Sequence, residues 1–221
     1  PPFITSTLQQ EAARKLGFSA GKTMLIAQQL YEGLDLGDLG STGLITYMRT
    51  DSTRIADEAL TAAREMIARV HGERFMPPEP RRYGKSKNAQ EAHEAIRPAQ
   101  VGPDFTPDRV KQYLSKDQHR LYELIWKRFL ASQMSNAVLD LLRVDIGADK
   151  CVFRANGSTV TFSGFLALYD ETREEAAGDG ESGVLPDLRE GIHPALQQLI
   201  DKQHFTQPPP RYSEASDRKS T

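Results

Sequence analysis

Apolar side chains recur every three or four positions through most of the first 133 residues, which is the spacing of helices with one buried face. Ser or Thr stands in front of several of these stretches and Gly behind them, as expected where helices begin and end. The pattern predicts four main helices: one from the capping box at 7–10 to Gly17, one from Ser19 to Gly33, one over 56–70, and one from the capping box at 115–118 to about Met134.

Four stretches have neither a helical nor a strand period. The segments 34–42, 75–88 and 178–183 combine Gly or Pro with polar residues, and they are predicted to be loops. The proline run within 207–211 is predicted to be extended, because a residue that precedes proline avoids the helical region. These stretches separate the regular elements from one another.

Beyond the last predicted helix, the period of the apolar residues shortens towards two. Val144 and Ile146 alternate with charged neighbours, which predicts a strand. The strand-like runs 151–155 and 159–162 flank Asn156-Gly157, and this pair predicts the turn of a β-hairpin.

The fold class that these patterns indicate is α+β, with a mainly helical domain over 1–133 followed by a β-rich one. The 221 residues include 28 Lys and Arg against 30 Asp and Glu. No apolar run approaches the ~20 residues of a membrane span. A single cysteine, Cys151, excludes a disulfide framework and any multi-cysteine zinc site within this chain.

Charge is divided unevenly along the chain. Residues 1–133 carry 19 basic and 16 acidic side chains, whereas residues 134–221 carry 9 and 14. Neither part has the strongly basic composition that is typical of proteins binding DNA mainly by electrostatics. A nucleic-acid partner would therefore be held through local contacts. The basic stretch 81–87 is one candidate for phosphate contacts, although basic loops are usually only solvated.

Two short motifs resemble known sites but lack an essential residue. Gly21-Lys22-Thr23 ends like a phosphate-binding loop, but Leu16 stands where that motif needs its first Gly. His93-Glu94 opens like a zinc-protease helix, but Arg97 stands where the second His ligand is required. The sequence therefore gives no support to an ATP site or to a zinc protease.

The segment 43–52, GLITYMRTDS, places five polar side chains around one tyrosine. Tyr47 beside Arg49 has two interpretations: packing with a salt bridge, which the residue types alone favour, or an activated nucleophile. A tyrosine with a pKa near ~10 is a weak nucleophile at neutral pH. A nearby guanidinium favours the phenolate and can neutralise charge on a phosphodiester. In an extended segment, the two-residue spacing puts both side chains on one face.

Segment 43–52 resembles the active-site signature of bacterial type IA DNA topoisomerase I. Three further blocks resemble the same family in the same order: residues 1–17 resemble the segment before its tyrosine, 90–98 (QEAHEAIRP) its second signature, and 203–216 the entry to its next domain. The four blocks extend over nearly the whole chain, so the resemblance is specific. It makes 34–42 an insertion ahead of the tyrosine.

The resemblance implies a covalent mechanism. Tyr47 would be the nucleophile that cuts one DNA strand, forming an ester with the 5′ phosphate and freeing a 3′ hydroxyl. Because the ester conserves the energy of the broken bond, the strand is resealed without ATP, and passage of another strand through the gap relaxes negative supercoils. Arg49 would contact the scissile phosphate and orient Tyr47. His93 would hydrogen-bond the phosphate or sugar beside the break.

Other residues of the signatures have less defined roles. Asp51 matches an acidic residue that positions Arg49 or His93. Thr46, Glu94 and Arg97 either contact DNA directly or hold the local backbone, and both alternatives are open. The implied DNA-binding residues are therefore Arg49, Asp51, Thr46 and Arg97. The implied substrate is single-stranded DNA, held through its backbone and by base stacking.

The resemblance also implies what this chain lacks. The family binds Mg2+ in an N-terminal toprim domain through a Glu and an Asp-x-Asp-x-Glu run, and no such run occurs here. No C-terminal four-cysteine zinc module is present either. The chain is expected to be a fragment: a helical gate domain over 1–133 that carries the tyrosine, a β-rich half of the arch domain over 134–202, and the truncated start of a DNA-binding domain over 203–221.

Several expectations follow from fragment status. The missing toprim domain of the same polypeptide would be a partner, and the isolated fragment would be inactive or nearly so. The parent would be a magnesium-dependent isomerase of DNA topology, cytoplasmic and associated with the nucleoid, with no membrane partner.

Two functions of other classes are also open. A stand-alone single-stranded DNA-binding module would bind weakly, given the modest charge of residues 1–133 and an aromatic content of 8%. A structural or protein-interaction domain would pack the Tyr47 hydroxyl away from solvent and from Arg49. The exposure of Tyr47 therefore separates this last alternative from the others.

Overall fold

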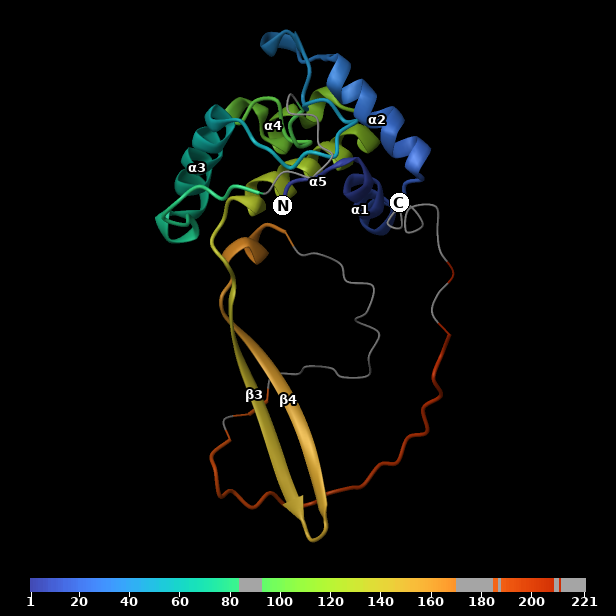
Figure 1. The fold of residues 1–221 in the computed structure, drawn as a ribbon, viewed down its shortest axis with the longest axis vertical. Helices are drawn as coiled ribbons and strands as arrows, with labels where there is room; N and C mark the ends of the chain where they lie inside the picture. Colours follow the sequence, from blue (N-terminus) through green and yellow to red (C-terminus); the bar gives the residue numbers. More distant parts are fainter. Residues whose placement is uncertain (84–92, 170–184, 187, 209–210, 212–221) are drawn as a thin grey trace. The chain divides into compact units, whose positions relative to one another are not determined.

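The computed structural model describes residues 1–83, 93–169, 185–186, 188–208 and 211. The described residues form two compact units (Figure 1). The first unit holds the described residues up to Ala137 together with 163–169, and the second holds 138–162 and the described residues from 185 onward. The α+β class is confirmed, with the helices in the first unit and the two long strands in the second. The predicted loop at 178–183 lies outside the described residues.

The described part of the chain contains five α-helices: α1 (Thr5–Leu16), α2 (Ala20–Glu32), α3 (Asp57–His71), the single-turn α4 (Pro107–Val110) and α5 (Lys116–Ser132). The four longer ones are the predicted helices. Ser19 caps α2, Ser115 and Gln118 form the capping box of α5, and Gly17 ends α1 with a φ of 69°. None of the described helices is long and apolar enough to cross a membrane.

Two local predictions in this unit are wrong. Thr7 does not begin α1 but is its third residue. Its hydroxyl accepts a hydrogen bond from Ile4 N at 3.0 Å, so it caps the N-terminus of the helix from a position within the first turn. Segment 34–42 is not purely a loop, because β1 (Leu34–Asp35) and β2 (Ser41–Thr42) pair antiparallel around a short 3-10 turn. The hydrogen bonds between β1 and β2 satisfy backbone N–H and C=O groups of this segment, and its composition did not predict that pairing.

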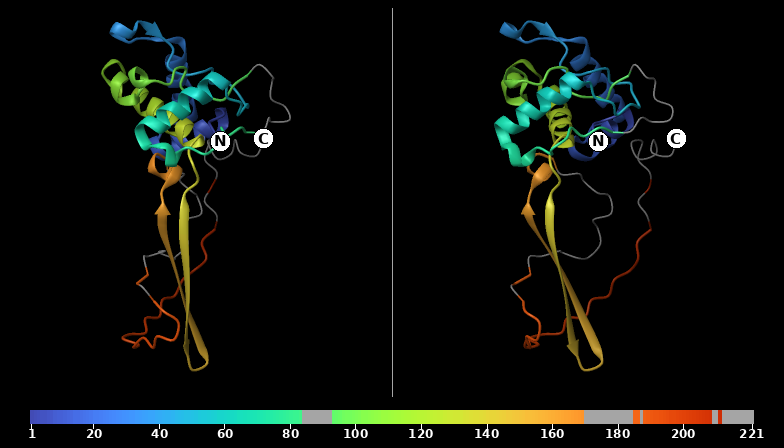
Figure 2. Two further views of the ribbon diagram at one scale, coloured as in Figure 1. Left: turned by 90° about the vertical axis from the view of Figure 1, so that its left-hand side faces the viewer. Right: turned by 60° about the vertical axis from the view of Figure 1, so that its left-hand side comes forward.

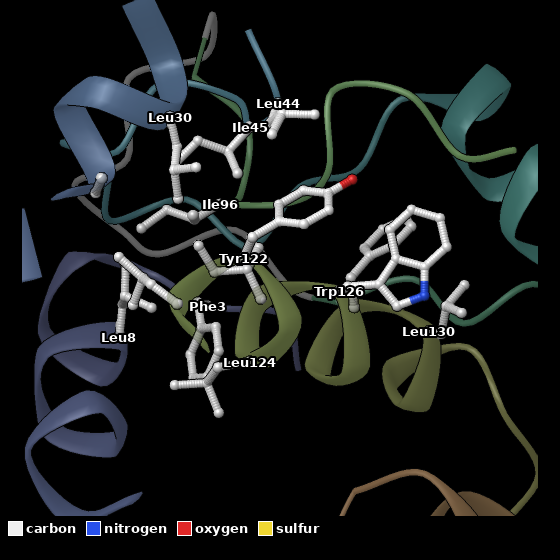
Figure 3. Close-up of a cluster of buried hydrophobic side chains, with 14 of the residues drawn as sticks. Phe3, Leu8, Leu30, Leu44, Ile45, Ile96, Tyr122, Leu124, Trp126 and Leu130 are labelled. Carbon is white, nitrogen blue, oxygen red and sulfur yellow. The ribbon is translucent and has the colours of Figure 1, made fainter. Parts of the chain in front are cut away.

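Helix α5 supplies much of the buried core of the first unit. Its Leu121, Tyr122 and Ile125 are completely buried. Figure 3 shows Tyr122 lying among side chains that include Ile45 and Ile96, which come from the two signature segments. The signatures are therefore built directly onto the main hydrophobic core.

The second unit is dominated by an antiparallel hairpin of β3 (Val138–Ala148) and β4 (Cys151–Phe162), which twist about each other along their length (Figure 2). Its turn lies at Asp149-Lys150, where Asp149 has a φ of 51°, a conformation that Asp tolerates better than most residues. The predicted turn at Asn156-Gly157 is wrong: this pair lies inside β4, because the register pairs the strands continuously past it.

Candidate active site

The segment that carries Tyr47 is fixed by backbone hydrogen bonds on both sides. Leu44 N donates to Leu30 O of α2 at 2.7 Å, and Thr46 N donates to Arg97 O at 2.9 Å. Leu44, Ile45 and Met48 are buried, whereas Tyr47 is 40% exposed. The apolar residues before and after Tyr47 thus anchor the segment in the core and leave the phenol at the surface.

Three segments that are distant in sequence are hydrogen-bonded to one another around the segment that carries Tyr47. Thr5 Oγ1 donates to Met48 O at 2.8 Å, and Thr50 N donates to Thr5 Oγ1 at 2.9 Å. Ile96 N donates to Phe3 O at 2.8 Å, so the start of the chain joins the second signature as well. The resemblance blocks at 1–17, 43–52 and 90–98 are therefore parts of one hydrogen-bonded arrangement. Thr5 was not among the predicted site residues.

Thr46 and Arg97 bind protein groups in this structure. Thr46 Oγ1 donates to Ala95 O at 2.7 Å and accepts from Arg97 N at 3.0 Å. The Arg97 guanidinium donates to Glu94 Oε2 at 2.6 Å and to Pro98 O at 2.8 Å. These contacts favour the interpretation in which both residues hold the backbone of the two signatures together. Direct contact of either with DNA stays a prediction.

Two aromatic rings flank Tyr47. The Tyr31 ring, in the last turn of α2, meets it edge-on with centroids 5.4 Å apart, and the His93 ring lies at 6.1 Å in a tilted arrangement. The structure therefore brings the predicted pair Tyr47 and His93 together. It also adds Tyr31, which sequence reasoning missed; the only signal was an aromatic residue at a helix end, and its distance from Tyr47 along the chain concealed the contact.

Arg49 and Asp51 are exposed, and exposed and buried residues alternate from Tyr47 to Ser52. Within the part of the chain that the structure describes, neither side chain forms a hydrogen bond or an ion pair. The salt bridge expected of a purely structural Arg49 is thus not formed among these residues. A structural domain would pack the Tyr47 hydroxyl away from solvent, and the 40% exposure of Tyr47 speaks against that alternative.

Three other tyrosines of this unit, Tyr83, Tyr122 and Tyr169, are poorly suited to act as phenolates. Burial raises the pKa of Tyr122, and it also raises that of Tyr169, whose hydroxyl donates to Glu11 Oε2 at 2.6 Å. Burial raises the pKa of Tyr83 too, although Arg81 partly opposes the shift. Tyr47 is 40% exposed, so unlike these three more deeply buried tyrosines it can be reached by a large substrate.

The predicted basic loop is described only at its beginning. Arg82 pairs with Asp57 at 2.6 Å, and Arg81 Nη2 donates to Asn136 Oδ1 at 2.8 Å. Arg81 also lines a hollow of about 170 Å³ together with Arg128 and other residues, but Tyr31, Tyr47 and His93 do not line it. The rest of the loop lies outside the described residues.

A Mg2+ site needs several oxygen ligands held close together. The described residues contain no group of three His, Cys, Asp or Glu side chains that could hold a metal ion. Mg2+ prefers carboxylate oxygens, and the region around Tyr47 offers no such set. The residues that the structure describes therefore do not fit the metal that the resemblance implies.

Known proteins share this sequence closely. A family model described as DNA topoisomerase matches residues 1–216. DNA topoisomerase 1 of Xylella fastidiosa is 54% identical over 220 residues, and that of Rickettsia bellii is 51% identical over 219; each match covers 98% of this chain and 27% of the relative. The solved full-length topoisomerase I from Thermotoga maritima is 44% identical with a TM-score of 0.66, over 82% of this chain and 29% of that one.

The matches cover nearly all of this chain but only part of each relative. The chain spans about a quarter of the length of its curated relatives. The family model nevertheless covers nearly all of the chain, including the segments around Tyr47 and His93. The chain therefore belongs to the DNA topoisomerase family.

Proposed function

We propose that this chain is the tyrosine-bearing part of a type IA DNA topoisomerase, which cuts one DNA strand, passes another through the gap and reseals the first. The observation that carries the proposal is the setting of Tyr47. Its neighbours Ile45 and Met48 are at most 2% exposed, whereas Tyr47 is 40% exposed. The Tyr47 ring lies between those of Tyr31 and His93. Such a segment presents a phenol to a large substrate without moving the backbone.

The proposed reaction is a transesterification. The Tyr47 oxygen attacks phosphorus, a tyrosine–phosphate bond forms to the 5′ side, and the bond to the 3′ oxygen breaks. The phenol proton is lost and the released 3′ oxygen takes up a proton, so charge and atoms balance. Resealing is the same exchange in reverse, and no external energy source is required.

The groups beside Tyr47 suit this exchange. Arg49 is exposed and makes no ion pair among the described residues, so its planar guanidinium is available to hold two phosphate oxygens. The His93 ring beside Tyr47 can donate a hydrogen bond to the phosphate or sugar next to the break. Asp51 lies on the same exposed stretch as Arg49 and would orient Arg49 or His93. Tyr31, Tyr47 and His93 together offer ring surfaces to single-stranded bases.

We further propose that these 221 residues do not complete the reaction by themselves. The single guanidinium of Arg49 neutralises only part of the charge of a phosphodiester transition state. In the relatives' family the remaining charge would be met by a toprim domain with Mg2+, and that domain would be the partner of this surface. The complete enzyme would work on chromosomal DNA in the cytoplasm.

A covalent trapping assay tests the proposal. The chain is mixed with a single-stranded oligonucleotide labelled at either end, Mg2+ and a separately expressed toprim fragment, and the mixture is then denatured. We expect an adduct on the 5′-phosphate side that is absent from Tyr47→Phe and absent without the added fragment. The matched control is Tyr113→Phe, because the Tyr113 ring lies against Gly37 and makes no ring contact with Tyr47 among the described residues.

The opposite results have a clear meaning. Binding of the oligonucleotide without any adduct, and with Tyr47→Phe equal to the unaltered chain, would support a non-catalytic single-stranded DNA-binding module. An adduct that persists in Tyr47→Phe would show that another residue is the nucleophile.

A further inference from the structure

Tyr31 has no role in the signatures, yet among the described residues its ring lies nearer to that of Tyr47 than the His93 ring does. The two rings meet edge-on, with an interplanar angle of 65° and centroids 5.4 Å apart. This is one of the preferred arrangements of aromatic pairs, because the positive edge of one ring faces the negative face of the other. We propose that Tyr31 is a positioning residue that holds the Tyr47 ring for attack, an inference that rests on the proposed function.

The backbone fixes the separation of the two rings. Leu44 N donates to Leu30 O at 2.7 Å, which ties the segment before Tyr47 to the last turn of α2. Gly43 lies so close to α2 that a Cβ atom there would be 2.4 Å from Tyr31 O. The close approach of these two backbones requires glycine at this position. The main chain therefore fixes how far apart the two residues lie, at a distance from which their rings can meet.

Tyr47 needs such support because it is at the surface. Exposed side chains exchange rotamers on the picosecond to nanosecond scale, and a 40% exposed ring has few core contacts to prevent this. Attack on phosphorus requires the phenol oxygen in line with the leaving oxygen, and loss of that orientation slows the reaction. Tyr31 closes one side of the ring and His93 borders it at 6.1 Å.

The ring of Tyr31, and not its hydroxyl, performs this role. Tyr31 is itself 40% exposed, so burial in the core does not explain an aromatic residue here. Its hydroxyl makes no hydrogen bond to any residue that the structure describes. Phenylalanine should therefore replace it, whereas an aliphatic side chain should not.

The test uses the same complemented trapping assay and compares three variants. Tyr31→Leu removes the aromatic ring, Tyr31→Phe removes only the hydroxyl, and Leu25→Ala changes another exposed side chain of α2. We expect Tyr31→Leu to form the adduct about two- to ten-fold more slowly, the range given by loss of one aromatic contact. Tyr31→Phe and Leu25→Ala should stay within twofold of the unaltered chain, and all variants should remain folded at the temperature of the assay.

A spectroscopic readout follows the ring itself. In spectra of ring-labelled tyrosine, the Tyr47 signals, assigned by their loss in Tyr47→Phe, should shift in Tyr31→Leu and stay in place in Tyr31→Phe. A Tyr31→Leu variant that forms adduct at the unaltered rate, or a Tyr31→Phe variant as slow as Tyr31→Leu, overturns the inference alone. An unaltered chain that forms no adduct overturns the proposed function, and the positioning role with it.

Discussion

The hydroxyl of Thr46 connects the two signature segments, and its removal is the most direct test of how the site is built. It donates to Ala95 O at 2.7 Å and accepts from Arg97 N at 3.0 Å. Valine has nearly the same shape but no hydroxyl. Thr46→Val therefore removes both hydrogen bonds and leaves a backbone carbonyl and a backbone N–H without this partner.

The size of the effect follows from these two groups. A buried donor or acceptor that loses its partner costs about 1–3 kcal/mol. Ala95 is completely buried and Arg97 is 9% exposed, so water replaces the hydroxyl poorly. Because Thr46 itself is only half-buried, we expect a loss of about 2 kcal/mol for the pair. For a unit of this size, that corresponds to a Tm lower by about 6–8 °C.

Fluorescence of the single tryptophan measures this change. Trp126 is 5% exposed in the core of the helical unit, so its emission reports unfolding of that unit. The control is Thr46→Ser, which keeps the hydroxyl and should cost less than about 1 kcal/mol. A Thr46→Val variant as stable as the unaltered chain but weaker in oligonucleotide binding would refute the structural role and assign the hydroxyl to DNA.

Three further predictions concern the surroundings of the site. Gly43→Ala puts a methyl group against Tyr31 O, so we expect a loss of about 1–3 kcal/mol in chemical denaturation and a weaker covalent adduct. Arg97→Lys replaces a planar fork by a single ammonium that cannot reach the same carboxylate and carbonyl oxygens, and denaturation should show a loss of about 2 kcal/mol. The hydrogen bond from Lys22 holds the pKa of Asp117 below its usual range, so the carboxylate stabilises the fold above that range and ceases to do so as the pH falls through the folded value. The Tm difference between Asp117→Asn and the unaltered chain should therefore vanish in acid and shrink in high salt; a difference that persists in acid would contradict this reasoning.

Helix ends were predictable where a side chain satisfies the backbone within one turn. Ser19 and Ser115 cap their helices as predicted, and Gly17 ends the first. Thr7 shows the limit of such predictions, because a threonine can also cap a helix from its third position. At Asn156-Gly157 the local turn preference did not decide the structure, since continuous pairing of β3 with β4 satisfies more backbone groups than a turn there would.

For the candidate site too, some features depend on the local sequence and others on tertiary contacts. The sequence by itself determined the α+β class, the family resemblance and the choice of Tyr47, Arg49 and His93, because these depend on residue type and spacing. Only the tertiary structure decided that Tyr47 is exposed and that Tyr31 flanks it. Contacts between residues distant along the chain depend on how helices pack and which backbone groups pair, and spacing within one segment carries no information about either.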